Sequence, residues 1–438
     1  MSEPQQQPVP APSHKTEGKG TVTLKWWQLL VAAIVVVALS VGVAVAVNTA
    51  IRNNTDEAAS SKDYKKPEKA KPQQTEKPKT SSRGNLIKRI GDTASIYKSQ
   101  ADKTLLASWT VTNITLDAPC VPAYEGAETS PANGHFVVLD ITVETTSDFV
   151  WQKIQPRPRD AHKGTFGSVL AVAGSASYRG AAALAVEGAL RTGAGIVTLA
   201  SVEPVLAAVA ARLPECCLCP CEAGAEGGIS PQNIDRIRRQ KASVLLAGPG
   251  LGYTAQSAAR AAETRALVKT LLPGFSGSAV LDADGLNAAA DLLQTEKMLH
   301  PQGELILTPH PGEMARLTGR SAAEINADRE GTALRYAKAW NAVVVLKGAH
   351  TVIAGPDGRC AVNPTGNPGL SRGGSGDVLA GMTSALLACG LPAFDAAACA
   401  VYLHGAAADR AAALHGETGM LPHDLLDALG TLFAENGR

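Results

Sequence analysis

The sequence predicts an α/β protein built on a parallel sheet, preceded by an N-terminal part of different character. Over residues 151–438, short apolar runs that end in glycine or polar residues alternate with alanine-rich stretches of helical periodicity. This alternation is typical of parallel strands that are covered by helices on both faces. The chain of 438 residues contains 42 glycines and only 4% aromatic residues, so we expect a core of Ala, Val and Leu.

Charge and cysteine content exclude several classes of protein. The 41 Lys and Arg residues nearly balance the 40 Asp and Glu residues, which leaves a formal net charge of +1. This balance excludes a nucleic-acid binder driven by bulk positive charge and a strongly acidic disordered chain. Eight cysteines are too few for a disulfide scaffold in a chain of this length. At roughly 150 residues per domain, the length predicts two to three domains.

The start of the chain indicates a polar tail followed by a membrane anchor. Residues 1–25 are rich in Gln, Pro, Ser and Lys, and we expect them to be disordered. A Trp-Trp pair then precedes an uncharged run over residues 29–47, which as a helix is about as long as one hydrocarbon core is thick. We therefore expect a transmembrane helix over residues 26–48. A cleaved signal peptide is the alternative, and lysines on both sides of the run leave its orientation open.

Two further segments are expected between this anchor and the α/β part. Residues 49–83 are rich in Lys and Pro, which predicts an extended linker. Residues 84–150 contain two runs that alternate between apolar and polar residues, Ser108–Leu116 and His135–Glu144, and these predict strands of a small all-β module. The strings WTVTNITLDAPC and NGHFVVLDITVET resemble immunoglobulin-like sandwich modules of bacterial lipoproteins and membrane proteins. Such a sandwich usually needs ~100 residues, so we expect a shortened one without a catalytic site.

We expect six strands in the α/β part. In chain order they are Ser168–Ala173, Ile196–Ala200, Val244–Ala247, Ala279–Asp282, Glu304–Leu307 and Val343–Leu346. In open parallel sheets, ligands bind at the carboxyl ends of the strands. The segments that directly follow these strands should therefore form the site.

A glycine-rich block before a helical stretch is the strongest local signal for such a site. The block NPTGNPGLSRGGSGDVLAGM spans residues 363–382, and we expect a helix to begin near Asp377. Glycines at a helix N-terminus expose backbone N–H groups where the helix dipole is positive, which creates an anion hole for phosphate. The block is neither a Walker loop nor a dinucleotide fingerprint. The carboxylate of Asp377 beside bound phosphate would suit a general base that takes the proton of an alcohol during phosphoryl transfer. The alternative interpretation is a glycine-rich turn in which Asp377 only caps the helix.

Six segments in order carry a resemblance to a known family. They are DAHKGTFGSVLAVAGSASYRGAAALAVEGALRTGAGIVTLA, LLAGPGLG, VLDADGLNAAA, LTPHPGEMARLTG, VVVLKGAHTVIAGPDG and the glycine-rich block. With them, residues 152–438 resemble the ADP/ATP-dependent NAD(P)H-hydrate dehydratases, whose fold is ribokinase-like. The resemblance implies a three-layer α/β/α domain that repairs hydrated NADH or NADPH. It would use Mg²⁺ and ADP or ATP to phosphorylate the C6 hydroxyl of the S epimer, after which phosphate leaves; ADP would yield AMP.

The resemblance also implies roles for individual residues. Asp377 corresponds to the catalytic base, and Gly376 to a nucleotide-binding glycine. The AMP part of the nucleotide would contact Lys347, Gly348, Ala349, His350 and Thr351, and the hydrated cofactor would contact Ala181, Gly250, His310 and Asp377. Small residues at two of these positions would let a flat ring approach the backbone.

Several of these side chains also have structural interpretations. His310, between two prolines, is either a ligand contact or a rigid turn residue. Glu313 either caps the following helix or positions a magnesium-bound water. Lys347 either approaches phosphate or ends a strand in solvent. Asp282 and Asp284, in the string LDADGLN, either line the site or cap a turn.

The string CCLCPC at residues 216–221 raises the question of a zinc site. Its four thiols lack the second pair of ligands at the spacing that structural zinc sites use, and no histidine lies nearby in the sequence. We therefore expect free thiols.

The predicted parts imply two different cellular settings. The enzyme needs cytoplasmic nucleotides, whereas the β module resembles extracytoplasmic ones, and both follow the same predicted span. Either the enzyme is anchored inside, or it lies outside without substrate, or the parts are joined artificially near residue 150. We expect a single-pass, membrane-anchored protein that binds small molecules and no nucleic acid, and that forms homo-oligomers through the α/β domain. The alternatives are another ribokinase-like kinase, acting on a vitamin or hydroxymethylpyrimidine, and an inactive membrane-anchored binding protein.

Overall fold

The computed structural model describes residues 93–97, 105–116, 137–144, 146–253, 257–294 and 297–438. The expected polar tail, transmembrane helix and linker lie outside these residues. Within the described part of the chain, no helix is both long enough and apolar enough to cross a membrane.

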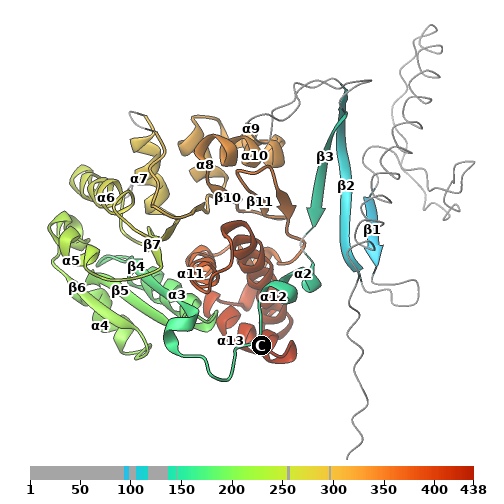
Figure 1. The fold of residues 1–438 in the computed structure, drawn as a ribbon. Helices are drawn as coiled ribbons and strands as arrows, with labels where there is room; N and C mark the ends of the chain where they lie inside the picture. The colour runs from blue at the N-terminus through green and yellow to red at the C-terminus, as the bar shows by residue number, and fades with distance from the viewer. Residues whose placement is uncertain (1–92, 98–104, 117–136, 145, 254–256, 295–296) are drawn as a thin grey trace, which may run out of the picture. The chain divides into compact units, whose positions relative to one another are not determined.

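The described strands form one twelve-stranded sheet (Figure 1). Its order is β1-β2-β3-β12-β11-β10-β9-β8-β7-β4-β5-β6. The strands are β1 (Thr93–Tyr97), β2 (Leu105–Leu116), β3 (Val137–Glu144), β4 (Ser168–Val172), β5 (Ile196–Val202), β6 (Cys217–Cys221), β7 (Val244–Ala247), β8 (Ser278–Leu281), β9 (Leu305–Leu307), β10 (Val343–Leu346), β11 (Val352–Ala354) and β12 (Cys360–Val362). The six strands expected in the α/β part are confirmed as β4, β5, β7, β8, β9 and β10.

The chain path creates a switch point in the middle of the sheet. The strands from β6 across to β10 are all parallel. The chain enters at β4, adds β5 and β6 on one side, and then adds β7, β8, β9 and β10 on the other side. Between β4 and β7 the direction of winding reverses, and ligands of open α/β sheets bind at the carboxyl ends beside such a reversal. The antiparallel strands β11 and β12 extend the sheet past β10.

Helices cover both faces of this sheet. They are α2 (Ser147–Lys153), α3 (Arg179–Arg191), α4 (Glu203–Ala210), α5 (Ile234–Arg238), α6 (Ala258–Leu271), α7 (Asp284–Leu292), α8 (Pro311–Thr318), α9 (Ala322–Ala327), α10 (Arg329–Trp340), α11 (Ser375–Ala388), α12 (Ala393–Gly419) and α13 (Pro422–Glu435). Four 3₁₀ turns accompany them: η1 (Lys163–Phe166), η2 (Ala225–Gly227), η3 (Pro231–Asn233) and η4 (Pro368–Leu370). One layer holds α3, α4, α11, α12 and α13, and the other holds α5 to α10 (Figure 1). The α/β part is thus a three-layer α/β/α domain, as expected.

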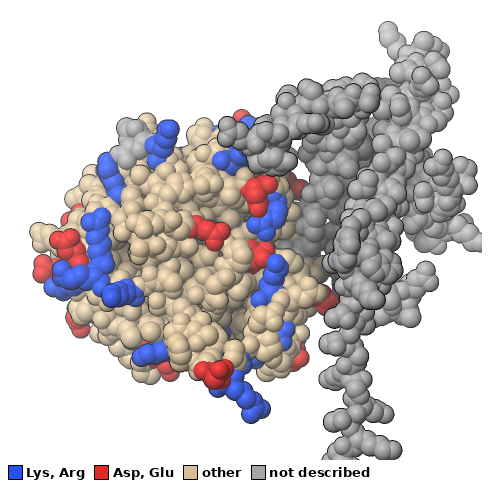
Figure 2. All heavy atoms as spheres, in the orientation of Figure 1, with Lys and Arg blue, Asp and Glu red and all other residues tan. Residues whose placement is uncertain are grey.

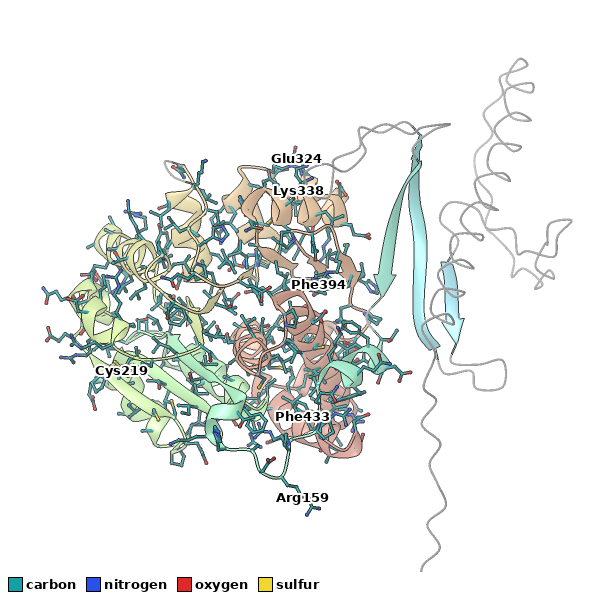
Figure 3. The ribbon with its side chains drawn as sticks, viewed as in Figure 1. Arg159, Cys219, Glu324, Lys338, Phe394 and Phe433 are labelled. Carbon is teal, nitrogen blue, oxygen red and sulfur yellow. The ribbon has the colours of Figure 1, made fainter. Side chains whose placement is uncertain are left out.

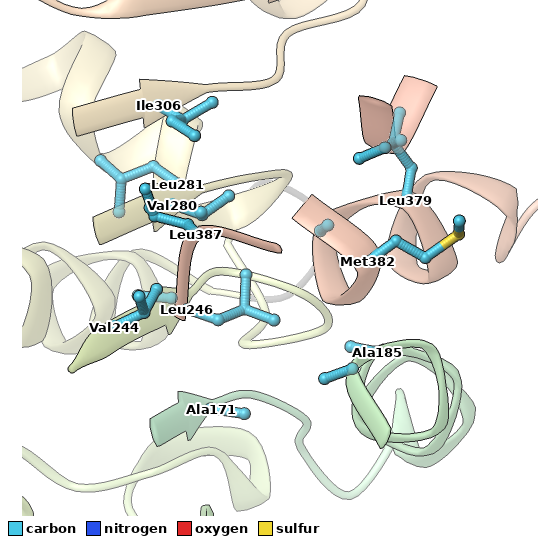
Figure 4. Close-up of a cluster of buried hydrophobic side chains, with 14 of the residues drawn as sticks. Ala171, Ala185, Val244, Leu246, Val280, Leu281, Ile306, Leu379, Met382 and Leu387 are labelled. Atoms are coloured by element: carbon cyan, nitrogen blue, oxygen red, sulfur yellow. The ribbon is translucent and has the colours of Figure 1, made fainter. Parts of the chain in front are cut away.

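Small residues let α3 and α11 approach each other closely. A Cβ on Gly188 would lie 2.7 Å from the carbonyl oxygen of Val378, and one on Gly381 would lie 2.0 Å from that of Ala185. Each glycine therefore permits a backbone contact that any side chain would block. Apolar side chains fill the space between this helix pair and the strands. Figure 4 shows part of the hydrophobic core of the domain and labels Ala171, Ala185, Val244, Leu246, Val280, Leu281, Ile306, Leu379, Met382 and Leu387.

The N-terminal strands differ from the expected sandwich. The two predicted runs are present as β2 and β3, which pair antiparallel, and β1 pairs antiparallel with β2. β3 then pairs in parallel with β12 through Val143 opposite Ala361 and Glu144 opposite Val362. These described strands therefore extend the sheet of the α/β domain and do not form a second sheet of their own. A parallel pairing between distant segments leaves no trace in either local sequence.

The α/β domain also begins earlier than the expected boundary at residue 151. Helix α2 starts at Ser147, and its Val150 is fully buried. Lys153 Nζ lies 2.6 Å from Asp395 of α12, and the guanidinium of Arg438 donates to the carbonyl oxygen of Trp151. A boundary at residue 151 would cut this helix, so the domain includes all of α2.

Charged side chains of both signs are interspersed over the face of the domain shown in Figure 2. Residues of neither sign form a continuous patch on that face. This distribution agrees with the near balance of charges in the sequence.

Candidate active site

The loop after β7 packs against the start of α3 at the switch point of the sheet. Gly250 has a φ of +63°, and a Cβ there would lie 2.9 Å from the Cβ of Ala181 and 2.8 Å from the carbonyl oxygen of Tyr178. The hydroxyl of Ser175, after β4, donates to the carbonyl oxygen of Gly250 over 2.9 Å. Only glycine fits this position, and the structure brings together two of the residues expected to contact the hydrated cofactor.

The glycine-rich block forms the N-terminus of α11. The helix begins at Ser375, two residues before the expected start, and its cap residue Gly374 has a φ of +101°. The left-handed φ favours glycine here, and a Cβ on Gly374 would also displace the end of the Leu184 side chain in α3, which would lie 2.7 Å away. The N–H groups of Gly376 and Asp377, in the first turn, have no partner within the helix and can bind an anion.

A partly buried cation lies beside this helix N-terminus. Lys347 Nζ lies 2.6 Å from Asp282 Oδ1 and 3.8 Å from Glu313 Oε2, and a Cβ on Gly376 would lie 3.4 Å from the same nitrogen. Asp282 also accepts a 2.7 Å hydrogen bond from the hydroxyl of Thr308. Burial alone would lower the pKa of Lys347, but Asp282 and Glu313 outweigh it and raise that pKa. Lys347 is therefore a paired ammonium, and the solvated strand-end interpretation is wrong.

Asp377 has the most strongly shifted pKa among the carboxyl groups of this cluster. Burial raises the pKa of Asp377 to about 7, and the nearby carboxylate of Asp282 adds to the shift. Lys347 partly offsets the rise. A carboxyl group with a pKa near neutrality accepts a proton effectively at physiological pH, and such groups concentrate at functional sites.

His310 and Glu313 cap α8 reciprocally. His310 Nδ1 accepts a 3.0 Å hydrogen bond from the backbone N–H of Gly312, and Glu313 Oε2 accepts a 2.9 Å bond from the backbone N–H of His310. Burial and the cation of Lys347 lower the pKa of His310, so the ring is neutral at physiological pH. Because Nδ1 accepts, the proton is on Nε2, and the half-exposed ring offers that N–H as a donor. The capping interpretation of Glu313 is the one that the structure shows.

The loop between β10 and β11 carries the expected AMP contacts. Its Gly348 has a φ of +151° and its His350 a φ of +54°. Arg329, at the start of α10, holds this conformation by donating to the carbonyl oxygens of Leu346 and Ala349. Gly348, Ala349 and His350 are exposed, which leaves their side of the loop open to a ligand.

Asp284 connects two parts of the site. Its Oδ2 accepts a 2.8 Å hydrogen bond from the backbone N–H of Gly252, in the loop after β7. Ala283, between the two aspartates, has a φ of +48° and a ψ of −117°, a conformation that non-glycine residues rarely adopt. The two proposed roles of Asp284 therefore coincide, because it fixes a loop and lies close enough to Asp377 to raise the pKa of that carboxyl.

The carboxylates of this cluster do not make a metal cage by themselves. Among the described residues, no group of three or more His, Cys, Asp or Glu side chains is placed to hold a metal ion. The ammonium of Lys347 occupies the position between Asp282 and Glu313. Mg²⁺ usually binds through substrate phosphates and retained waters, so this donor set fits an ion that arrives with the nucleotide.

The cysteine string lies on β6, at the edge of the sheet, where Figure 3 labels Cys219. Cys216, Cys219 and Cys221 are buried and Cys217 is exposed, and all four are free thiols. Burial raises the pKa of Cys216 to about 11 and that of Cys221 to about 12. The thiols of Cys216 and Cys221 are therefore protonated and unreactive at physiological pH.

Comparison with known proteins places this geometry in a family. A family model for NAD(P)H-hydrate dehydratases matches residues 169–430. The chain belongs to the NAD(P)H-hydrate dehydratase family. The residues matched by the family model, 169–430, include the switch point, the loop that follows Lys347 and the N-terminus of α11.

Two relatives of this dehydratase-family chain illustrate its extent. It is 46% identical over 283 residues to a bifunctional NAD(P)H-hydrate repair enzyme of Moorella thermoacetica, covering 64% of this chain and 52% of the relative. It is 40% identical over 254 residues to an ADP-dependent (S)-NAD(P)H-hydrate dehydratase of Neisseria meningitidis, covering 58% of this chain and 80% of that protein. The chain thus spans about half the length of the bifunctional relatives that it matches.

Solved structures agree with the family assignment. The crystal structure of the ADP/ATP-dependent NAD(P)H-hydrate dehydratase of Bacillus subtilis, co-crystallised with ATP and Mg²⁺, is 34% identical and aligns with a TM-score of 0.58. The alignment covers 66% of this chain and 97% of the Bacillus protein. A ribokinase-like superfamily protein of Enterococcus faecalis aligns with a TM-score of 0.57 at 26% identity. The fold of the α/β domain is therefore ribokinase-like, as the resemblance implied.

Proposed function

We propose that this chain catalyses the ADP- or ATP-dependent dehydration of the S epimer of NADH hydrate and NADPH hydrate. The observation that carries the proposal is the placement of Asp377, a carboxyl group with a pKa of about 7, in the first turn of the phosphate-binding helix α11. Membership of the dehydratase family supports it further. With ADP as the donor, the products are the repaired cofactor, AMP and phosphate.

Asp377 acts as the general base in this proposal. Its carboxylate takes the proton of the C6 hydroxyl while that oxygen forms a bond to the terminal phosphorus of the nucleotide, and the bond to the leaving AMP oxygen breaks. The N–H groups of Gly376 and Asp377 stabilise the charge on the transferred phosphoryl group. The C6–O bond then breaks, phosphate leaves, and loss of a proton from the neighbouring ring carbon restores the double bond.

The other residues of the site bind and orient the two substrates. The Nε2–H of His310 is available as a neutral donor to the hydrated cofactor, and Ala181 and Gly250 leave room for its ring. The loop of residues 347–351 holds the AMP part of the nucleotide, with Lys347 countering the charge of Asp282 and Glu313. Mg²⁺ accompanies the nucleotide and neutralises phosphate charge when it is bound.

The proposal is tested by adding the full chain to NADH hydrate with ADP and Mg²⁺ and following the recovery of NADH absorbance. Recovery should require the nucleotide and should yield AMP and phosphate in equal amounts. Asp377→Asn should fold and bind ADP but lose ~10²–10⁴-fold in turnover, because the general base is removed. A wild-type protein that binds ADP and the hydrate without forming NADH would contradict the proposal.

We further propose that residues 26–48 anchor this enzyme in a membrane as a single span. The uncharged run over residues 29–47 supports the anchor. The need for cytoplasmic nucleotides supports an orientation with the domain on the cytoplasmic side. Extraction with alkaline carbonate should leave the full chain in the membrane fraction, and it should release a chain that lacks residues 1–48. Release of both chains would contradict the anchor.

We also propose that the α/β domain forms homo-oligomers. Two apolar side chains next to the turn between α12 and α13 are exposed, Leu414 at 79% and Leu421 at 39%, and they support a contact between copies. Light scattering of the detergent-solubilised full chain should give a mass above that of one chain, and Leu414→Glu should lower it. A monomeric wild type would refute this contact.

A further inference from the structure

A buried histidine contacts the backbone of the anion hole from behind. His404 lies on α12, is 7% exposed, and places its Nε2 2.9 Å from the carbonyl oxygen of Ser375. Ser375 is the first residue of α11. The histidine thus reaches the N-terminus of α11 from the neighbouring helix α12 of the same layer.

The chemistry of this contact fixes its direction. A carbonyl oxygen only accepts, so Nε2 of His404 carries the proton and donates. Burial lowers the pKa of His404 to about 4, so the ring is neutral at physiological pH. The Ser375 oxygen has two lone pairs and can accept this bond in addition to the bond within the helix.

The acceptor belongs to the same peptide group as a phosphate-binding donor. In a trans peptide, the carbonyl of Ser375 and the N–H of Gly376 point in opposite directions. With the carbonyl held by His404, the N–H of Gly376 is held toward the open end of the helix. A hydrogen bond accepted by the carbonyl also polarises the peptide and strengthens its N–H as a donor.

Helix α12 holds the preceding part of the glycine-rich block as well. The hydroxyl of Thr365 donates to the carbonyl oxygen of Tyr402 over 2.9 Å. Asp409 accepts a 3.0 Å bond from the backbone N–H of Gly366 and another from the side chain of Asn367. His404 therefore lies in a row of α12 contacts that fix the block from residue 365 to the start of α11.

We propose that His404 is a positioning residue for the reaction: it fixes and polarises the Ser375–Gly376 peptide so that the N–H of Gly376 is a strong donor to the transferred phosphoryl group. This inference rests on the proposed function for its kinetic consequence. The hydrogen bond itself is a property of the free protein and can be measured without substrate.

The sequence offers a selective spectroscopic test. The dipeptide Ser-Gly occurs at two places in the chain, Ser276–Gly277 and Ser375–Gly376. Cell-free synthesis of the full chain with ¹³C-carbonyl serine and ¹⁵N-glycine should therefore give two peaks in a spectrum that correlates each amide with the preceding carbonyl. In His404→Leu, the Ser375 carbonyl and the Gly376 amide proton should both move upfield, while the Ser276–Gly277 peak stays in place as the internal reference.

Kinetics then test the consequence for catalysis. His404→Leu should lower kcat by ~10-fold or more, because weakening one donor costs part of the ~10²–10³-fold that its removal costs. KM for the hydrate should not change, and His404→Gln, which keeps a donor, should recover part of the loss. Leu403→Ala is the matched control on the same helix, since it removes buried volume without a hydrogen-bonding group. It should leave the Ser375 carbonyl and kcat unchanged.

Each outcome decides the inference. An unmoved Ser375 carbonyl in folded His404→Leu, or an equal loss of kcat in Leu403→Ala, would overturn it. If His404→Leu does not fold, ¹⁵N spectra of histidine in the wild type decide instead, because a ring protonated on Nδ1 and not on Nε2 would overturn the inference. A wild type that lacks dehydratase activity would refute the proposed function while leaving the spectroscopic result standing.

Discussion

Replacing Asp282 by asparagine should make the enzyme more active at low pH. The Asp282 carboxylate is the second cause, after burial, of the raised pKa of Asp377. Asparagine keeps an oxygen that can accept the bonds from Thr308 and Lys347 but removes the negative charge. The pKa of Asp377 should therefore fall. The base works when it is deprotonated, so activity rises with pH through the pKa, and a lower pKa moves this rise to lower pH.

The expected size follows from the starting pKa of about 7 for Asp377. A like charge close to a carboxyl group shifts its pKa by ~1–3 units, and we take about one unit for Asp282. At pH 6 the ionised fraction of Asp377 would then rise from about a tenth to about a half. The expected gain in kcat/KM is ~5-fold at pH 6 and less than about twofold at pH 7, with no gain well above neutrality.

The assay is the pH profile of kcat/KM for the hydrate at saturating ADP, which reports the pKa in the enzyme that holds ADP but not yet the hydrate. Asp291→Asn is the matched control, because Asp291 pairs with Arg265 and Tyr253 and does not contribute to the shift of Asp377. Its profile should coincide with that of the wild type. A midpoint that stays in place or moves upward in Asp282→Asn would refute the electrostatic account of the site.

Three further outcomes are expected. Asp377→Asn should raise Tm more at pH 8 than at pH 4. The pKa of Asp377 is about 7 in the folded protein and ~3.9 in the unfolded chain, so the wild type loses folding stability as pH rises through 7, whereas asparagine carries no charge to bury. Equal shifts of Tm at the two pH values in a thermal scan would contradict this. Gly376→Val should fold, since its φ is ordinary, but should abolish ADP binding in calorimetry by filling the space beside Lys347; unchanged affinity would refute the phosphate site. A chain that begins at residue 155 should have a much lower Tm than one that begins at residue 147. It loses the buried Val150, whose burial stabilises the folded state by ~1.5–3 kcal/mol. Equal Tm values would show that α2 does not contribute to stability.

The parallel strands could be predicted because burial on both faces leaves a continuous apolar run in the sequence. β6 was missed because its sequence, CLCPC, contains a proline and no β-branched residue, and the strand lies at the sheet edge where proline is tolerated. β11 and β12 are only three residues long each, too short for a periodic signal.

The site could be predicted where its chemistry is local. The anion hole and Asp377 lie in one block, so the sequence places them together. The ion pair of Lys347 could not be predicted in the same way. Its partner Asp282 lies 65 residues before it in the chain, and only the fold brings the two charges together. His404 is one of two histidines in the alanine-rich helix α12, and nothing near it in the sequence indicates that it contacts Ser375.

The central claim is that the C6 hydroxyl is phosphorylated before it leaves. Hydrate labelled with a heavy oxygen isotope at the C6 hydroxyl should be incubated with the full chain, ADP and Mg²⁺, and both phosphate and water should be analysed by mass spectrometry. Transfer through Asp377 and the anion hole predicts that the label appears in the released phosphate, in step with the NADH formed. Label found in water, with unlabelled phosphate, would contradict this account.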